Sequence, residues 1–380
     1  MKISKIPGLG DYGKFIDDVS LLEMSDADWM ELGKEHLKQL VTIFRNVDIQ
    51  PSEFERKMYL WGEPRVIDGY RVRKKYRDTC GISNLYTLWK RDLLEPHDKI
   101  QLEKLAHFTS GGDEFTEEKI PELSQLHRIS GMHEEGKPMG MFSEGELFWH
   151  SNEAGFIAFN PSIGLMGAKG MVGSSTGFVI TATWYDKQTD SYKRELDDMT
   201  VKFLFEGYRG TPGLNKEQDE VFNWNQSFES IELPLVITSP GGIKGLHYAP
   251  YASEETEFTK KLDRELFVEE NIYQHKYQQN NDIIIFDNSI TLHNRIGSPA
   301  ERVAYRTPCD YSRLIPTGYN FYLQEPFKTQ YDEIQRDIGE TLGIKSRMED
   351  NLIYKKFIKP NLPKRVWKNN DLVNRDFMTT

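Results

Sequence analysis

Histidine, amide and arginine side chains at two distant points of the sequence have the types and spacing that could do chemistry. At residues 147–152 a β-prone run ends in a polar turn, and strand alternation sends His150 and Asn152 to one face. A histidine followed two positions later by an acid or an amide can hold two neighbouring positions around a metal ion. Taken alone the pair is a weak signal, because a single histidine beside a tryptophan is more often a core or surface residue.

The second point lies 143 positions later (293 − 150), at His293, after an apolar run and a turn at 283–292. Alternation along residues 301–306 then places Arg302 and Arg306 on one face of a strand. Two guanidinium groups inside a barrel need anionic partners, because a buried unpaired charge is very costly. A dicarboxylate ligand would satisfy both arginines.

The sequence around these points predicts mainly β structure with helical additions, an α+β chain. From about residue 126, short β-prone runs alternate with Gly, Pro, Asn and Ser, which is typical of a sandwich or barrel. The runs cover residues 126–129, 147–150, 155–159, 177–184, 201–205, 233–238, 245–248, 283–286 and 302–307. Helices are expected at 254–266 and 331–342.

The chain is expected to open with a helix and then a strand. Ser25 and the residues that follow it resemble a helix cap, and apolar residues recur at helical spacing from Trp29 through about Val41. Residues 41–44 form a β-prone run. Residues 51–110 show no single period and are interpreted as mixed helix and loop.

Composition limits the class of protein. The 380 residues hold 48 Lys and Arg against 59 Asp and Glu, a formal net charge of −11, and 12% are aromatic. The aromatic content argues against disorder, and the acidic balance argues against nucleic acid as a partner. Cys80 and Cys309 are too few for a disulfide framework or a thiolate zinc site. With no apolar leader or membrane-length run, a cytoplasmic protein without membrane attachment is expected.

In their order and spacing, the motifs closely resemble the TauD/TfdA family of Fe(II)- and 2-oxoglutarate-dependent dioxygenases. The likeness rests first on His150-x-Asn152, on His293 and on the Arg302 and Arg306 pair. It spans about residues 10 to 310. The likeness rests on the common order and spacing of these motifs.

Further segments extend the resemblance. Residues 173–176, which end in Thr176, fall where the family carries a Gly-Gly-Asp-Thr turn, and Tyr185 follows nine positions later as in a typical member. Residues 239–246 look like the His-Pro-x-Thr-Gly-Arg-x-x-Leu entry to a family strand. The opening helix and strand at 29–45 are similar as well.

The resemblance implies a double-stranded β-helix, a cupin-like jelly roll whose mouth holds iron between two histidines and a carboxylate. His150 and His293 match the two metal-binding histidines. Arg302 and Thr176 match the pair that binds the distal carboxylate of 2-oxoglutarate, through contacts that suit guanidinium geometry. Arg306 matches a second arginine, which faces either the cosubstrate or an anionic substrate.

The activity that the resemblance implies is oxidation of a C–H bond in a small-molecule substrate, with hydroxylation as the expected outcome. Fe(II) would be the metal, and 2-oxoglutarate and O2 the cosubstrates. Succinate and CO2 would be released, with the protein supplying geometry and exclusion of water. Arg306 favours an anionic substrate, but nothing in the expected specificity loops, 51–125 and 186–232, names the molecule.

Asn152 departs from the family pattern, because the family normally has Asp as the carboxylate ligand. An amide oxygen is neutral and binds a hard divalent ion less well, so iron affinity should fall. Three explanations compete: Asn152 ligates weakly, Glu153 takes the position, or water or an anion such as chloride fills it. The rival functions are a catalytically impaired protein that binds 2-oxoglutarate and metal, and a halogenase-like variant.

One domain is expected at 1–315, because the two halves of the iron site must meet in a single barrel. Residues 316–380 are expected to be a helical extension. Between 345 and 368 this extension has eight Lys and Arg against two acidic residues, and association into a homo-oligomer is its expected use. The other histidines are interpreted as structural or surface residues, and among them His247 is the one to compare with the pocket.

Overall fold

The structure is a computed structural model. It describes residues 1–62, 79, 93–96, 127–134, 137–138, 142, 145–152, 154, 161–203, 231–250, 252–311 and 313–315. The strand predicted at 155–159, the helix predicted at 331–342 and the whole extension at 316–380 lie outside these residues, so the domain division and the role in oligomers stay predictions. Within the described ranges, no helix has the length and apolar character that a membrane crossing requires.

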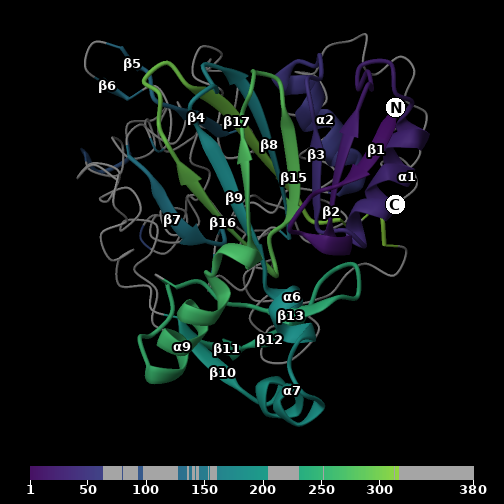
Figure 1. Cartoon of the computed structure of the whole chain (residues 1–380). Helices are drawn as coiled ribbons and strands as arrows, with labels where there is room; N and C mark the ends of the chain where they lie inside the picture. The colour runs from purple at the N-terminus through teal and green to yellow at the C-terminus, as the bar shows by residue number, and fades with distance from the viewer. Residues whose placement is uncertain are drawn as a thin grey trace.

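Two β-sheets dominate the described chain, which is mainly β as predicted (Figure 1). In spatial order, the strands of the larger sheet are β1 (Lys2–Lys5), β2 (Gly13–Asp17), β3 (Val41–Phe44), β15 (Ile283–Asp287), β8 (Ser162–Lys169), β17 (Val303–Cys309) and β4 (His127–Ser130). Neighbours run antiparallel except β2 and β3, which are parallel.

A smaller antiparallel sheet faces the larger one. Its strands, in spatial order, are β14 (Ile272–Lys276), β9 (Ser175–Ile180), β16 (Thr291–Ile296) and β7 (Leu147–His150). The rings of Phe178 on β9 and Phe286 on β15 lie 5.3 Å apart between their centroids, so side chains of the two sheets meet in a shared core. The space between the sheets is where the predicted site residues lie.

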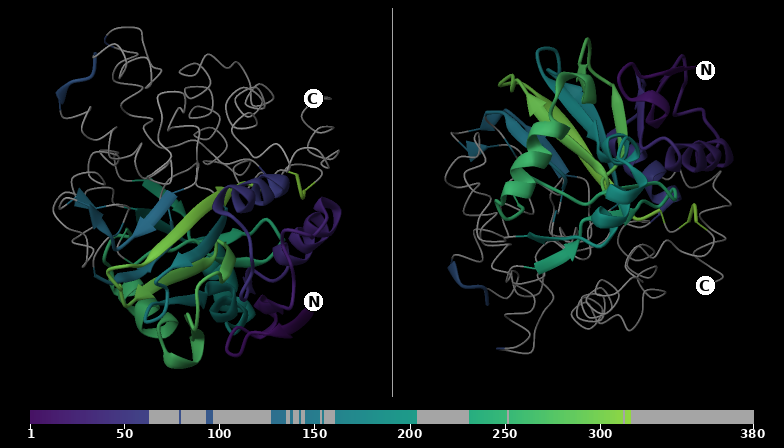
Figure 2. Two further views of the ribbon diagram at one scale, coloured as in Figure 1. Left: turned by 90° about the horizontal axis from the view of Figure 1, so that it is seen from above. Right: turned by 60° about the horizontal axis from the view of Figure 1, so that its bottom comes forward.

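Helices α1 (Asp26–Leu37) and α2 (Pro51–Trp61) lie against the larger sheet and each other (Figure 2). Ser25 caps α1 as predicted, accepting the backbone N–H of Asp28 at 3.1 Å. The helix ends earlier than predicted, at Leu37, because Leu40 adopts a φ of 60° and the chain then enters β3.

Strand β8 shows how the larger sheet is covered on both faces. Ile163 and Leu165 point to the space between the sheets, whereas Gly164 points to α2. A Cβ atom on Gly164 would lie 2.5 Å from the Cζ atom of Phe54. Only a residue without a side chain lets the helix approach this closely, and the glycines of β8 hid the strand from the sequence analysis.

A further layer lies below the sheets in Figure 1. Its elements are α6 (Thr181–Asp186), α7 (Asp190–Asp197), α9 (Glu257–Leu266) and two antiparallel strand pairs, β10 (Thr200–Phe203) with β11 (Ile231–Pro234) and β12 (Val236–Thr238) with β13 (Lys244–Leu246). The remaining described elements are the short pair β5 (His133–Glu134) and β6 (Lys137–Pro138) and the 3-10 turns η1 (Gly10–Tyr12) and η3 (Glu269–Asn271).

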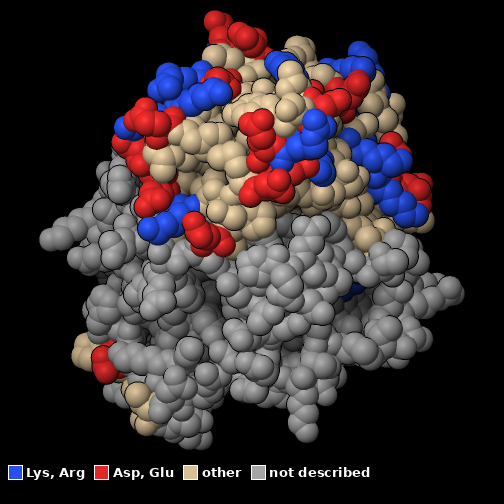
Figure 3. Space-filling view, turned by 90° about the horizontal axis from the view of Figure 1, so that it is seen from below, with Lys and Arg blue, Asp and Glu red and all other residues tan. Residues whose placement is uncertain are grey.

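The surface of this layer mixes both signs of charge. Figure 3 views it from below Figure 1 and shows Lys and Arg interspersed with Asp and Glu. Ion pairs such as Lys244 with Asp197 (2.7 Å) and Lys260 with Glu255 (3.0 Å) contribute to this mixture. In the described part of this face, basic and acidic side chains are therefore interspersed.

One predicted strand is wrong in its second half. The run at 177–184 forms β9 only to Ile180, and residues from Thr181 onward form α6. The change of direction follows from Thr181, whose backbone N–H and hydroxyl both donate to the carbonyl of Ile290, at 3.0 and 2.8 Å. A β-prone run of side chains could not reveal this long-range anchor.

The buried carboxyl of Asp287 gives a pH-dependent prediction. Its Oδ1 atom accepts the backbone N–H groups of Ser289 and Ile290 and the hydroxyl of Ser289, while burial raises the pKa of Asp287 to about 6 from its usual 3.8. The folded protein therefore keeps a proton that the unfolded chain releases. The free energy of unfolding should therefore fall as the pH rises from about 4 to above about 6, by up to about 3 kcal/mol in total.

The variant Asp287→Asn keeps the acceptor and removes the charge. The free energy of unfolding of the variant minus that of the wild type, both measured by urea denaturation, should therefore rise by that amount between about pH 4 and about pH 7. Asp11→Asn is the control, because Asp11 is fully exposed and its pKa is lowered by Lys5. A constant difference between Asp287→Asn and wild type across this range would contradict the assignment.

Candidate active site

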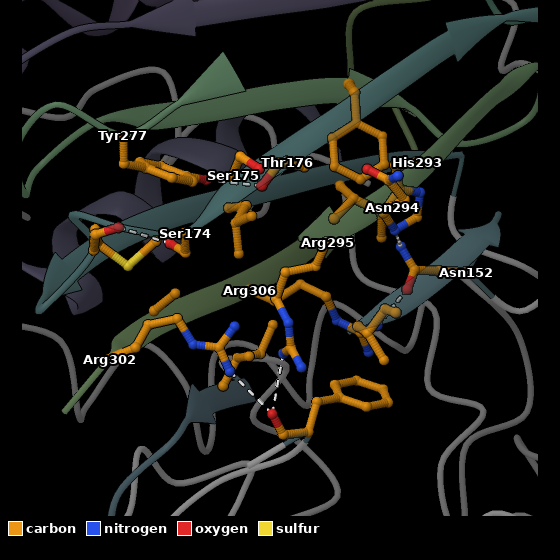
Figure 4. A pocket seen from close by; sticks show the side chains of 18 of the residues that line it. Asn152, Ser174, Ser175, Thr176, Tyr277, His293, Asn294, Arg295, Arg302 and Arg306 are labelled. Atoms are coloured by element: carbon orange, nitrogen blue, oxygen red, sulfur yellow. Dashed lines mark hydrogen bonds between the residues drawn. The ribbon is translucent and has the colours of Figure 1, made fainter. Parts of the chain in front are cut away.

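A cavity between the two sheets brings together all six site residues chosen from the sequence (Figure 4). Its walls come from β7, β9 and β16 of the smaller sheet and from β8 and β17 of the larger one. The polar residues that line it are His150, Asn152, Ser174, Ser175, Thr176, Tyr277, His293, Asn294, Arg295, Arg302 and Arg306. Among the described lining residues there is no Asp or Glu.

The two histidines meet across neighbouring strands. His150 at the end of β7 pairs directly with His293 on β16, and the two ring centroids lie 4.0 Å apart. Nδ1 of His150 lies 2.6 Å from the carbonyl oxygen of Phe148, a contact that places the ring proton on Nδ1 and the lone pair on Nε2. The structure thus joins two residues that are 143 positions apart.

Burial keeps both imidazoles neutral. It lowers the pKa of His150 to about 4 and the pKa of His293 well below its usual range, and the nearby charge of Arg306 acts in the same direction on both. A neutral imidazole is the form that binds a metal ion, so the pair could hold one near neutral pH without competition from protons.

β7 ends at His150, and Asn152 lies in the turn that follows. The predicted strand alternation therefore does not reach it, although its side chain still enters the cavity. Its Nδ2 atom lies 3.2 Å from Nε2 of His293, and its Oδ1 atom accepts a hydrogen bond from Arg306 at 2.9 Å (Figure 4). A guanidinium group can only donate, so the amide oxygen must face Arg306.

Asn288 fixes this turn and was missed by the sequence analysis. Its side-chain oxygen accepts the backbone N–H of Asn152 at 2.9 Å, and its Nδ2 atom donates to the backbone carbonyl of Asn152 at 2.8 Å. Asn288 is buried between β15 and β16. The clamp ties the turn that carries Asn152 to the strand that carries His293, and no local pattern in the sequence points to it.

Arg302 and Arg306 reach the cavity from the same face of the chain, together with Ala304, as alternation predicts. Arg302 is only 2% exposed, and burial lowers its pKa to about 10. One of its terminal nitrogens donates to the carbonyl of Phe142 at 2.9 Å, but its Nε atom has no hydrogen-bond partner among the described residues. A buried cation with an unused donor and no acid along its cavity fits an anionic ligand.

A third arginine, Arg295, was also missed. It lies on β16 two positions after His293, so the alternation applied to Arg302 would have found it. Its terminal nitrogens donate to the carbonyls of Phe142 at 3.0 Å and Gly145 at 2.7 Å. Burial and the charge of Arg302 lower its pKa to about 9. Together with Arg302 and Arg306, Arg295 gives the cavity three arginines.

Hydroxyl groups line the cavity beside these cations. Oγ1 of Thr176, on β9, lies 3.1 Å from the hydroxyl oxygen of Tyr277, and both side chains are buried. Thr176 was expected here, and Tyr277 was not. Together with Arg302 they could bind a carboxylate.

The side chains predicted to bind the metal are two imidazoles and an amide. No group of three His, Cys, Asp or Glu side chains able to hold a metal ion occurs in the described part of the chain. Glu153, the other candidate for the third position, lies outside the described residues. His150 and His293 fit two positions of a divalent metal, whereas Asn152 turns its oxygen to Arg306.

Other residues considered in the sequence analysis lie elsewhere. His247 packs against Phe203, with 5.0 Å between ring centroids, and is not among the cavity residues. Tyr185 belongs to α6 and donates its hydroxyl to Asp197 at 2.7 Å. Residues 239–243 form the turn between β12 and β13. These segments support the fold and not the cavity.

Comparison with known proteins agrees with the family resemblance of the sequence motifs. A family model described as "Taurine catabolism dioxygenase TauD, TfdA family" matches residues 7–307. No curated protein matches the chain.

Two solved structures show the same fold. One is the crystal structure of AAD-2 in complex with Mn(II) and N-oxalylglycine, with a TM-score of 0.53 and 16% identity over 81% of this chain and 97% of that one. The other is a taurine dioxygenase from Burkholderia xenovorans, with a TM-score of 0.50 and 15% identity over 81% and 88%.

Proposed function

Because this chain belongs to the TauD/TfdA family of dioxygenases, we propose that it hydroxylates a C–H bond of a small anionic molecule and releases succinate and CO2. The family's cofactors are Fe(II), 2-oxoglutarate and O2, and its fold is proposed to be the double-stranded β-helix. The observation that carries the proposal is a cavity lined both by two neutral histidines and by a buried arginine that has an unused donor.

His150 and His293 are the proposed metal ligands. Both are neutral, both lie in the cavity, and the carbonyl of Phe148 orients the ring of His150 so that Nε2 can coordinate. Bound iron would supply the redox chemistry with O2. Asn152 is proposed to occupy the third protein position around the metal. Arg306 holds its side chain, and Asn288 holds its backbone.

Arg302 and Thr176 are the proposed binding residues for the distal carboxylate of 2-oxoglutarate. A guanidinium group matches a carboxylate in charge and in the spacing of its donors. Arg306, on the same face of β17, is proposed to meet a second anionic group, on the cosubstrate or on the substrate. Three arginines and no acid among the described lining residues favour a substrate that carries negative charge.

A second candidate function is a protein that binds 2-oxoglutarate but has lost productive iron chemistry. The bond from Arg306 to Oδ1 of Asn152 favours it, because that bond turns a neutral ligand away from the histidines. The halogenase-like alternative requires an anion in the same position.

Product analysis distinguishes these functions. The Fe(II)-loaded protein, given 2-oxoglutarate and O2, should release succinate above the level of a His293→Ala control. Binding of 2-oxoglutarate without succinate release would contradict the oxygenase proposal and support the binding protein. Chlorinated products in the presence of chloride would instead support the halogenase-like variant.

A further inference from the structure

Tyr277 places a hydroxyl group in the cavity that no motif in the sequence had suggested. It follows β14 directly, is 3% exposed, and lies 3.1 Å from Oγ1 of Thr176 (Figure 4). Each hydroxyl has one hydrogen to donate, and a single bond between the two uses only one of them. One hydroxyl hydrogen of this pair is therefore left to donate to another acceptor.

The unused donors of this region lie around one cavity. Arg302 enters from the start of β17 and has no hydrogen-bond partner for Nε among the described residues. Burial raises the pKa of Tyr277 above its usual value, so its hydroxyl keeps its proton near neutral pH. A carboxylate has two oxygens that only accept, and it would use the donors of Arg302 and of the hydroxyl pair together.

Contacts on the side away from the cavity fix the position of the Tyr277 ring. Its backbone N–H donates to the carbonyl of Ser174 at 3.3 Å, and its ring meets His275 edge to face, with 4.8 Å between centroids. Nε2 of His275 lies 3.0 Å from Oδ2 of Asp282, whose other oxygen accepts the backbone N–H of Asn46 at 2.9 Å. These contacts fix the wall of the cavity that carries the Tyr277 hydroxyl.

We propose that Tyr277 is a third binding residue for the distal carboxylate of the 2-oxo acid, beside Thr176 and Arg302. This inference rests on the proposed function, since it assigns a role within the same cosubstrate site. Thr176 and Tyr277 bind the carboxylate from the smaller sheet, and Arg302 binds it from the larger one. Loss of the phenol hydroxyl removes a hydrogen bond to a charged group without altering the shape of the wall.

The experiment measures the dissociation constant of 2-oxoglutarate by isothermal titration calorimetry with the Mn(II)-loaded full chain. Tyr277→Phe should weaken binding about tenfold or more, because hydrogen bonds to charged groups are the stronger ones. Tyr273→Phe is the matched control. Tyr273 lies on β14 too, but its hydroxyl lies 3.4 Å from Nδ1 of His275 and its side chain lines a different groove. It should leave the constant unchanged.

Oxalate separates a local effect from general damage, because it can bind the metal but has no distal carboxylate. Tyr277→Phe should leave oxalate affinity unchanged while 2-oxoglutarate affinity falls. Equal losses for both ligands, or no loss for 2-oxoglutarate, would overturn the inference. If wild type itself fails to bind 2-oxoglutarate, the proposed function falls, whereas tight binding by both wild type and Tyr277→Phe overturns only the role of Tyr277.

Discussion

Replacing Arg302 with alanine should weaken 2-oxoglutarate binding by about a hundredfold or more. Arg302 is 2% exposed and no acid lines its cavity among the described residues, so the anion would lose its main buried partner. The segment at Phe142 should stay in place, because Arg295 also donates to that carbonyl, at 3.0 Å. Calorimetry with Mn(II)-loaded protein gives the dissociation constant.

Two controls locate the effect of Arg302. Arg302→Lys keeps the charge but loses the fork of donors, so its affinity should fall between those of wild type and alanine. Arg45→Ala removes an arginine that binds Asp17 and is not among the cavity residues, and it should leave the constant unchanged. An Arg302→Ala protein that binds 2-oxoglutarate as tightly as wild type would refute the role of Arg302.

Replacing Asn152 with aspartate should raise the affinity for a divalent metal by about tenfold or more. The change puts a carboxylate 3.2 Å from Nε2 of His293, where the amide nitrogen now lies, and hard divalent ions prefer charged oxygen ligands. Arg306, now 2.9 Å from Oδ1, would hold the other carboxylate oxygen. Electron paramagnetic resonance of free Mn(II) measures the affinity directly.

Asn294→Asp is the matched control for this gain. Asn294 also lies on β16 and lines the cavity, but its Oδ1 atom accepts the backbone N–H of Gly177 at 2.9 Å, so the same added charge is directed to Gly177 and not to the imidazole pair. It should raise metal affinity much less. Equal affinities of wild type and Asn152→Asp would contradict the assignment of position 152 to the metal site.

The rate of succinate release by Asn152→Asp shows whether the native amide limits the reaction or is required for it. Faster succinate release would mean that the native amide limits the chemistry of the wild type. Slower release despite tighter metal binding would mean that the reaction requires the amide. Either result reports on why this chain departs from the family pattern.

The sequence predicted most reliably what depends on alternation along a strand. Arg302 and Arg306 share a face of β17, and the histidine of β7 lies in the same cavity, because the two-residue period is intrinsic to extended backbone. Asn152 shows the limit of this argument. Its strand ends two residues earlier, and the side chain reaches the cavity through a turn that Asn288 holds.

The remaining differences come from contacts between distant segments. Tyr277 meets Thr176 across 101 positions, and Asn288 meets Asn152 across 136, so no local pattern could pair them. Thr181 ends β9 through the carbonyl of Ile290, against the β propensity of its neighbours. Arg295 is different, since the period that identified Arg302 would also have placed it beside His293.

We expect this cavity to hold Fe(II) and 2-oxoglutarate together, in one complex that absorbs visible light. Fe(II) and then 2-oxoglutarate are added to the protein without oxygen, and the visible absorption spectrum is recorded. A saturable charge-transfer band should appear with wild type, and it should be absent with His293→Ala. Folded, iron-loaded wild-type protein that gives no band at saturating 2-oxoglutarate would contradict the claim.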